Sequence, residues 1–181
     1  MTEKSKKIEF YSRLLKWFSL SGMVLLPLFL LFYWFLDGLW IIFATPGAEA
    51  LFQLSHISLA PLSRSIRIYG FLIDLIPNSF YFFILFNLKK LFSIYEQNEF
   101  FTKASIKHLR YIAFALLISQ IFHPLYVFLN GYILTLAQLS TSIPLYNLIE
   151  VKNLFLGLIF LLVSKLMEVG NQLEEENKGT I

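Results

Sequence analysis

Four polar residues interrupt otherwise apolar stretches and are the first candidates for chemistry. Asp74 and Asn78 are four residues apart, so a helix places both on one face. Gln120 and His123 are three residues apart and share a helix face in the same way. A charged or amide group inside a membrane span is costly and marks a functional site by default. These four residues therefore form a possible intramembrane polar site for a proton or a ligand.

Both pairs also have a purely structural interpretation. Asp74 lies close to the outer end of its apolar run, where Arg64 or Arg67 could pair with it. Gln120 and His123 could form polar contacts inside a helix bundle, because unpaired polar groups are costly there. The sequence leaves the two interpretations open.

Other kinds of active site have little support in the sequence. His56, His108 and His123 have no metal-ligand spacing, and the topology derived below places them at different depths. The absence of cysteine excludes disulfides, thiolate metal sites and thiol chemistry. There is no Gly-x-Ser-x-Gly motif, and Asp74 is the single acid at span depth, too few for an aspartyl dyad. We expect no catalytic residues, no metal, no cofactor and no enzyme activity.

Four apolar runs must position these residues. The chain is 57% hydrophobic and 15% charged, whereas a soluble domain has about 25% charged residues. Each run is near the length of about 20 residues that a spanning helix needs. The pattern predicts an all-α fold, an integral membrane four-helix transmembrane bundle that forms a single domain over residues 1–181. The predicted spans are 17–36, 68–88, 111–132 and 151–169; the connections are 37–67, 89–110 and 133–150, with a tail at 170–181.

The basic residues give the orientation. Five precede the first span and five lie between the second and third, against two (Arg64 and Arg67) in connection 37–67 and one, Lys152, at the start of the fourth span. Basic residues gather on the cytoplasmic side of a membrane, so both termini are predicted to be cytoplasmic. The segments 37–67 and 133–150 then face outward, and the lipid bilayer is the first expected partner. A signal peptide is the rival interpretation of the N-terminus, but the apolar run is too long and is expected to be an uncleaved anchor.

The predicted inner connection contains clear helix punctuation. Polar residues 96–99 should end one helix. Thr102 is a suitable N-cap for the next helix, and Phe101 with Ile106 would form a hydrophobic staple. Basic side chains in the following turns can reach anionic lipid headgroups.

The predicted cytoplasmic surface combines this turn with the tail. We expect Arg110 and Glu168 to lie within reach of one another, since both are near the same membrane boundary. Lys165 and Glu168 are three residues apart and can pair. The residues predicted to bind a partner are Glu96, Asn98, Phe101, Thr102, Arg110, Gly170, Leu173 and Asn177.

Three stretches resemble one family of bacterial membrane proteins. They are LFSIYEQNEFFT at 91–102, IKHLRYI at 106–112 and GNQLEEENKGTI at 170–181. The family is domain of unknown function 2975, and the resemblance covers roughly residues 61–181. Asn98 and Ala113 stand where the family usually has glycine, and Ser105 where it often has asparagine. Genes of the family often neighbour helix-turn-helix regulators, so the resemblance implies a regulatory partner.

Two functions follow as hypotheses. The first is a non-enzymatic, multi-pass sensor or regulatory subunit of the bacterial cytoplasmic (inner) membrane, acting through its cytoplasmic connection and tail. Its partner would be a cytoplasmic regulator protein or a larger membrane complex, with no direct contact to nucleic acid. The second is a small oligomeric transporter, or a membrane protein that binds a hydrophobic ligand, and it would use the intramembrane polar residues. A homo-oligomer suits the second hypothesis because four helices make a narrow bundle.

Overall fold

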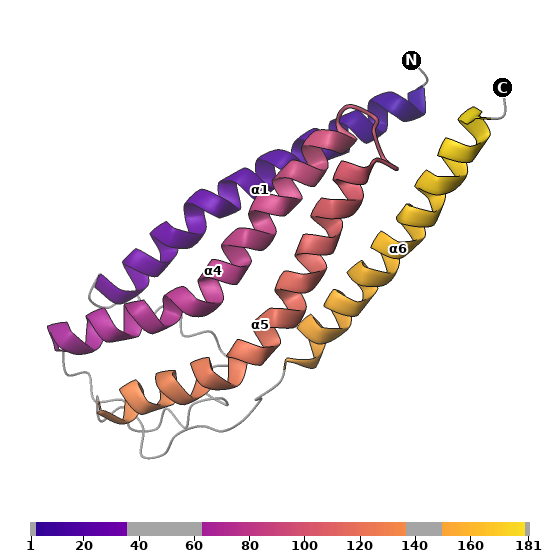
Figure 1. The fold of residues 1–181 in the computed structure, drawn as a ribbon. Coiled ribbons are helices and arrows are strands. Elements are labelled where there is room, and N and C mark those ends of the chain that lie inside the picture. Colours follow the sequence, from indigo (N-terminus) through magenta and orange to yellow (C-terminus); the bar gives the residue numbers. More distant parts are fainter. Residues whose placement is uncertain (1–2, 36–62, 137–149, 180–181) are drawn as a thin grey trace. The chain divides into compact units, whose positions relative to one another are not determined.

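The described part of the chain is entirely helical outside its short connections. The computed structural model describes residues 3–35, 63–136 and 150–179. These residues form four α-helices and no strand: α1 (Glu3–Phe35), α4 (Arg64–Tyr95), α5 (Lys103–Leu136) and α6 (Val151–Gly179) (Figure 1). The predicted all-α class is confirmed.

The helices continue past the predicted spans because their polar ends remain helical. The predicted connection 89–110 is helical at both ends, so α4 and α5 are separated by residues 96–102 only. The tail belongs to α6 as far as Gly179. The predicted outer segments lie largely outside the described residues, apart from the first turn of α4 and the last residues of α5.

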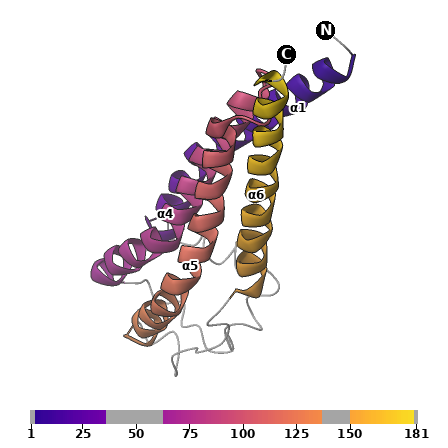
Figure 2. The same ribbon diagram turned by 45° about the vertical axis from the view of Figure 1, so that its right-hand side comes forward.

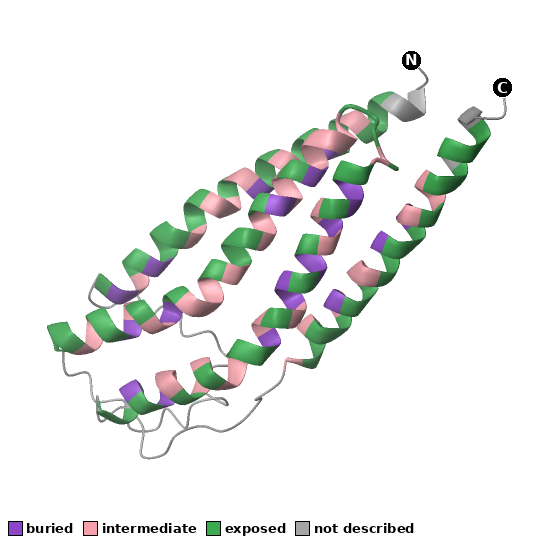
Figure 3. Ribbon diagram, viewed as in Figure 1, coloured by how far each residue is buried: buried purple, intermediate pink, exposed green. Residues whose placement is uncertain are grey.

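All four helices are long and apolar enough to cross a membrane. The qualifying segments are Lys6–Phe35, Arg64–Tyr95, Lys103–Ile133 and Val151–Asn177. Large apolar side chains on them are strongly exposed, including Phe18 at 71%, Ile121 at 75% and Phe155 at 63%. Exposed residues predominate along α1 and α6 (Figure 3). Water-soluble monomers rarely expose continuous apolar surface of this kind.

The chain forms two compact units, each made of helix segments that are distant in the sequence. Unit 1 comprises Met1–Val24, Phe80–Ser119 and Val151–Ile181. Unit 2 comprises Leu25–Ser79 and Gln120–Glu150.

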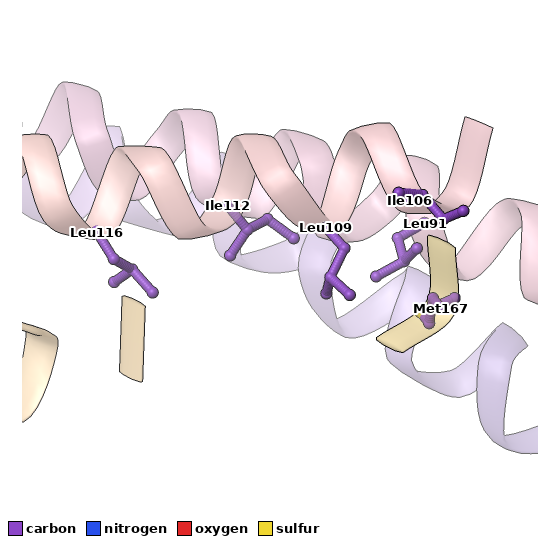
Figure 4. Packing of buried hydrophobic residues seen from close by; sticks show 6 residues of the cluster. All are labelled: Leu91, Ile106, Leu109, Ile112, Leu116 and Met167. Carbon is purple, nitrogen blue, oxygen red and sulfur yellow. The ribbon is translucent and has the colours of Figure 1, made fainter. Parts of the chain in front are cut away.

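The core of unit 1 lies where α4, α5 and α6 meet. It contains Leu91 from α4, Met167 from α6, and Ile106, Leu109, Ile112 and Leu116 from α5 (Figure 4). The α5 members recur every three or four residues, which is the spacing of one helix face. The helices approach closely at glycines: a β-carbon on Gly157 would lie 2.9 Å from the Leu117 side chain, and one on Gly22 3.2 Å from Leu85.

One end of unit 1 carries the connection between α4 and α5. The start of α1, this connection and the end of α6 lie at that end in both views (Figures 1 and 2). We call it the turn end. Asn98 in the connection has a φ of 61°, a left-handed conformation that favours Gly and that Asn tolerates better than most residues. Asparagine is therefore suited to this position of the turn.

Thr102 caps α5 as predicted. Its Oγ1 accepts a hydrogen bond from the Ser105 backbone N–H at 3.2 Å, while the Ser105 hydroxyl accepts one from the Thr102 N–H at 3.2 Å. This reciprocal pattern is a capping box with serine in the place of the usual acidic or amide residue. The cap fixes where the connection ends and the helix begins.

Candidate functional site

A cluster of ion pairs ties the turn end to α1. The Glu96 carboxylate accepts a hydrogen bond from Arg13 Nε at 2.8 Å through one oxygen, and one from Lys16 Nζ through the other. Arg13 also pairs with Glu9 at 2.8 Å. Hydrogen bonds from Lys16 and Arg13 hold the pKa of Glu96 below its usual range, so the carboxylate is charged near neutral pH. We call Glu9, Arg13, Lys16 and Glu96 the Glu96 cluster.

The same connection is attached to α6. The ring of Phe101 packs so closely on Gly170 that a β-carbon there would lie 3.1 Å from it. The Asn171 side-chain amide donates a hydrogen bond to the Phe101 carbonyl, and Lys103 pairs with Glu175 at 3.0 Å. The structure thus brings the predicted turn and tail together, and a β-carbon at position 170 would make the Phe101 ring shift by a few tenths of an ångström.

The predicted link between α5 and α6 is present. Arg110 Nη2 lies 3.4 Å from Glu168 Oε1. The other oxygen of Glu168 pairs with Lys165 at 2.7 Å, as its spacing of three residues predicts. Arg110 and Glu168 therefore contact one another at the turn end.

The remaining predicted partner residues divide by exposure. Asn98, Leu173 and Asn177 are exposed, and Phe101 is exposed although one side of its ring covers Gly170. Their binding of a partner stays a prediction. The accessible surface of the turn end thus includes four of the eight predicted partner residues.

A buried hydrogen bond joins α4 to α5 in unit 1. Asn87 is fully buried, and its amide donates to the Phe83 carbonyl at 2.8 Å. Its oxygen therefore faces the His108 ring and accepts from Nδ1 at 2.9 Å. The sequence analysis did not select Asn87. The signal was available, because Asn87 and His108 are nearly equidistant from Asn98 at the centre of a helical hairpin.

The network around Asp74 is the main polar feature of unit 2. The Trp34 indole N–H donates to Asp74 Oδ2 at 2.7 Å, and the Tyr126 hydroxyl donates to Oδ1 at 3.0 Å. Asn130 donates to the Tyr126 hydroxyl at 3.2 Å. We call Trp34, Asp74, Tyr126 and Asn130 the Asp74 network.

The suggested pairing of Asp74 with Arg64 or Arg67 is wrong for the described residues. The carboxylate is buried, and both of its oxygens are engaged by aromatic donors instead. The sequence analysis assigned Trp34 to an interfacial aromatic belt, and nothing in the spacing linked it to Asp74. Asn78 shares the helix turn as predicted, but its amide donates to the Asp74 backbone carbonyl at 2.7 Å and not to the carboxylate.

Gln120 and His123 gather around one acid. The Gln120 oxygen accepts a hydrogen bond from the Glu150 backbone N–H at 2.9 Å. The His123 Nδ1 lies 4.0 Å from the Glu150 carboxylate. Gln120 is buried and His123 is half-buried. Each has Glu150 as a polar neighbour, in agreement with the polar contacts that the sequence predicted. Glu150 is the residue that sequence reasoning missed, because it follows a long connection.

Residues 3–35, 63–136 and 150–179 contain no group of three His, Cys, Asp or Glu side chains that could hold a metal ion. They do contain polar contacts between helices, charged at the turn end and hydrogen-bonded around Asp74.

Comparison with known proteins gives one match. The model of a family described as "Protein of unknown function (DUF2975)" matches residues 15–181, so the match begins well before the resemblance visible in the sequence. Neither the search of curated proteins nor the search of solved structures found a match.

Proposed function

Because the chain belongs to the DUF2975 family of proteins of unknown function, we propose its role from its own geometry. It is a non-enzymatic four-span membrane protein whose turn end binds a cytoplasmic regulatory protein. One observation carries this proposal: residues 96–102 contact two helices at the same time. Glu96 binds Arg13 and Lys16 of α1, and the Phe101 carbonyl accepts a hydrogen bond from α6. The connection is thereby a defined surface joined to two membrane helices.

The exposed apolar side chains support insertion of the four helices in a membrane. The basic residues before the first predicted span and between the second and third support a cytoplasmic location for both termini and for the turn end. On this arrangement the four helices form a transmembrane bundle in the cytoplasmic membrane.

The attachment of the turn suggests how a signal would pass. A ligand or lipid that shifts α1 or α6 would displace Glu96 or Phe101, because each contacts the corresponding helix. The exposed residues Gln97 and Asn98 would then present a different surface to the partner. Such a coupling needs only that the signal binds the two arrangements with different affinity.

Site-specific photo-crosslinking tests this function. A photoreactive residue at Gln97 or Asn98 should capture a soluble cytoplasmic protein, and one at exposed Val151 should not. Glu96→Gln, which removes the charge that Arg13 and Lys16 contact, should reduce the capture. Equal capture of the same proteins at Val151 would refute a binding surface at the turn end.

The polar residues of unit 2 support a second candidate function. Asp74 and the residues around Glu150 could serve a small oligomeric transporter or a ligand site. The two proposals separate with Asp74→Asn. If the protein is a transporter, Asp74→Asn should abolish function and leave binding of the partner at the turn end unchanged. If it is a regulatory subunit, function and partner binding should change together: both are kept, or both are altered.

A further inference from the structure

Two lysines beside the Asn87–His108 contact lack acidic partners. Lys90 on α4 and Lys107 on α5 are both exposed. Among the described residues no carboxylate lies within ion-pair distance of either ammonium group. By contrast, Lys16, Lys103 and Lys165 in the same unit each pair with a glutamate.

The lysine side chains lie along aromatic rings. The Lys90 ammonium is 5.7 Å from the centre of the Phe86 ring, and the Lys107 ammonium is 5.7 Å from that of Tyr111. Both rings are partly exposed. Contact with a ring face leaves the positive charge unneutralised, so each ammonium can still bind an anion. Lysines that place their stems on apolar surface and their charge at its edge are typical of the membrane interface.

The two lysines flank one contact between α4 and α5. Lys107 adjoins His108 in the sequence, and Lys90 follows Asn87 by three residues on α4. The His108 ring is held by its hydrogen bond to Asn87 and lies 6.4 Å from Tyr111, centre to centre. The Asn87–His108 bond joins α4 to α5 and therefore holds the helix segments that carry Lys90 and Lys107 against one another.

We propose that Lys90 and Lys107 bind the phosphate of an anionic membrane lipid, whose acyl chains lie along the exposed faces of Phe86 and Tyr111. A phosphate group matches two exposed positive charges that lie beside one helix contact and have no carboxylate partner among the described residues. A lipid, in preference to free phosphate, matches the apolar rings next to them. The site requires that the chain lies in a membrane but not that the turn end binds a regulator, so the two proposals can fail separately.

The test is lipid titration of the purified full chain in phosphatidylcholine nanodiscs, with phosphatidylglycerol as the probe and native mass spectrometry as the readout. Lys90→Gln and Lys107→Gln should each weaken phosphatidylglycerol binding about fivefold, since one basic residue at an anionic surface contributes about 1 kcal/mol. The double variant should weaken it more than either single variant, on the order of 25-fold, because it removes both charges that contact the phosphate. Lys90→Arg with Lys107→Arg keeps both charges and should retain binding.

Lys103→Gln is the matched control, because it removes the same charge at the same end from a lysine that is paired with Glu175. It should change phosphatidylglycerol binding less than twofold. The proposal is overturned if the double glutamine variant binds as the native chain does, or if Lys103→Gln weakens binding equally. It is also overturned if millimolar inorganic phosphate displaces the lipid, since the site would then be one for free phosphate.

Discussion

The turn end and the Asp74 network hold helices together by opposite means. At the turn end, charged side chains pair at the surface: Lys103 is 79% exposed and its partner Glu175 is 56% exposed. Around Asp74, the carboxylate is buried and receives hydrogen bonds from Trp34 and Tyr126. Exposed ion pairs are weak and screened by salt, whereas a buried polar group left without its partner is costly. The contacts at the turn end can therefore rearrange at a small free-energy cost, whereas those around Asp74 hold their helices in one arrangement.

This difference fits the proposed role of the turn end as a regulatory surface. A surface that responds to a signal needs contacts that exchange at little cost, such as the exposed Lys103–Glu175 pair. The helices that carry the response need at least one set of contacts that does not exchange. Substitutions that weaken each region in turn test this difference. The loss in stability should be larger around Asp74 than at the turn end.

The largest effect is expected from Gly70→Ala. A β-carbon at Gly70 would lie 2.1 Å from the Trp34 ring, so the indole must move and its bond to Asp74 must break. We expect a loss of about 3 kcal/mol in the free energy of unfolding, as for an overpacked core. Denaturant titration in mild detergent measures it.

Gly22→Ala in unit 1 is the control for that substitution. Its β-carbon would meet only the end of the flexible Leu85 side chain, at 3.2 Å. Alanine is also the better helix former, so stability should stay within about 1 kcal/mol of the native value. Trp34→Phe, which removes the ring atoms that clash, should partly rescue Gly70→Ala; equal losses for both glycines would contradict the packing argument.

Tyr126→Phe should have an intermediate effect. It deletes the hydroxyl that donates to Asp74 and accepts from Asn130. A hydrogen bond inside a membrane protein contributes about 1 kcal/mol, so the loss should be about 1–2 kcal/mol. Tyr132→Phe on the same helix is the control, because Tyr132 is exposed and lies outside the network. If both tyrosines cost the same, the Asp74 network contributes nothing specific.

Acid should remove the contribution of the Glu96 cluster. The pKa of Glu96 is lowered by its bonds to Lys16 and Arg13, so the folded state binds this proton less readily than the unfolded state. The stabilisation is complete above the unfolded pKa of about 4.3 and is lost as pH falls through the lowered value. The Tm of the native chain should exceed that of Glu96→Gln at about pH 6 and converge with it in strong acid. Glu99→Gln, which changes an exposed acid in the same turn, should show no such difference.

The smallest effect is expected at the Arg110–Glu168 pair, because Glu168 keeps a second partner in Lys165. Arg110→Glu should lower the Tm slightly, and adding Glu168→Arg should restore part of the loss. A double-mutant cycle measures the coupling. Strictly additive changes would show that the two charges do not stabilise one another.

Contacts that follow from helical spacing or from shared depth were predictable from the sequence. The Thr102 cap depends on neighbouring residues, and the Lys165–Glu168 pair on a spacing of three. The Arg110–Glu168 contact followed from the position of both residues at the ends of their spans.

Contacts between distant helices were predictable only where a short turn sets the register. Asn87 and His108 flank such a turn, but an isolated asparagine near a basic segment gave no reason to select it. Trp34 and Asp74 are separated by a long connection, so no sequence spacing relates them. The preference of a buried carboxylate for aromatic donors over nearby arginines is decided by packing, which the order of residues does not reveal.

Cysteine labelling of intact cells tests the cytoplasmic location of the turn end most directly. The chain has no native cysteine, so single cysteines at Ser5, Ser58, Gln97, Thr141 and Thr180 report without background. An impermeant maleimide should label only Ser58→Cys and Thr141→Cys, and label the other three after the membrane is permeabilised. Labelling of Gln97→Cys in intact cells would place the turn end outside and contradict a cytoplasmic binding surface.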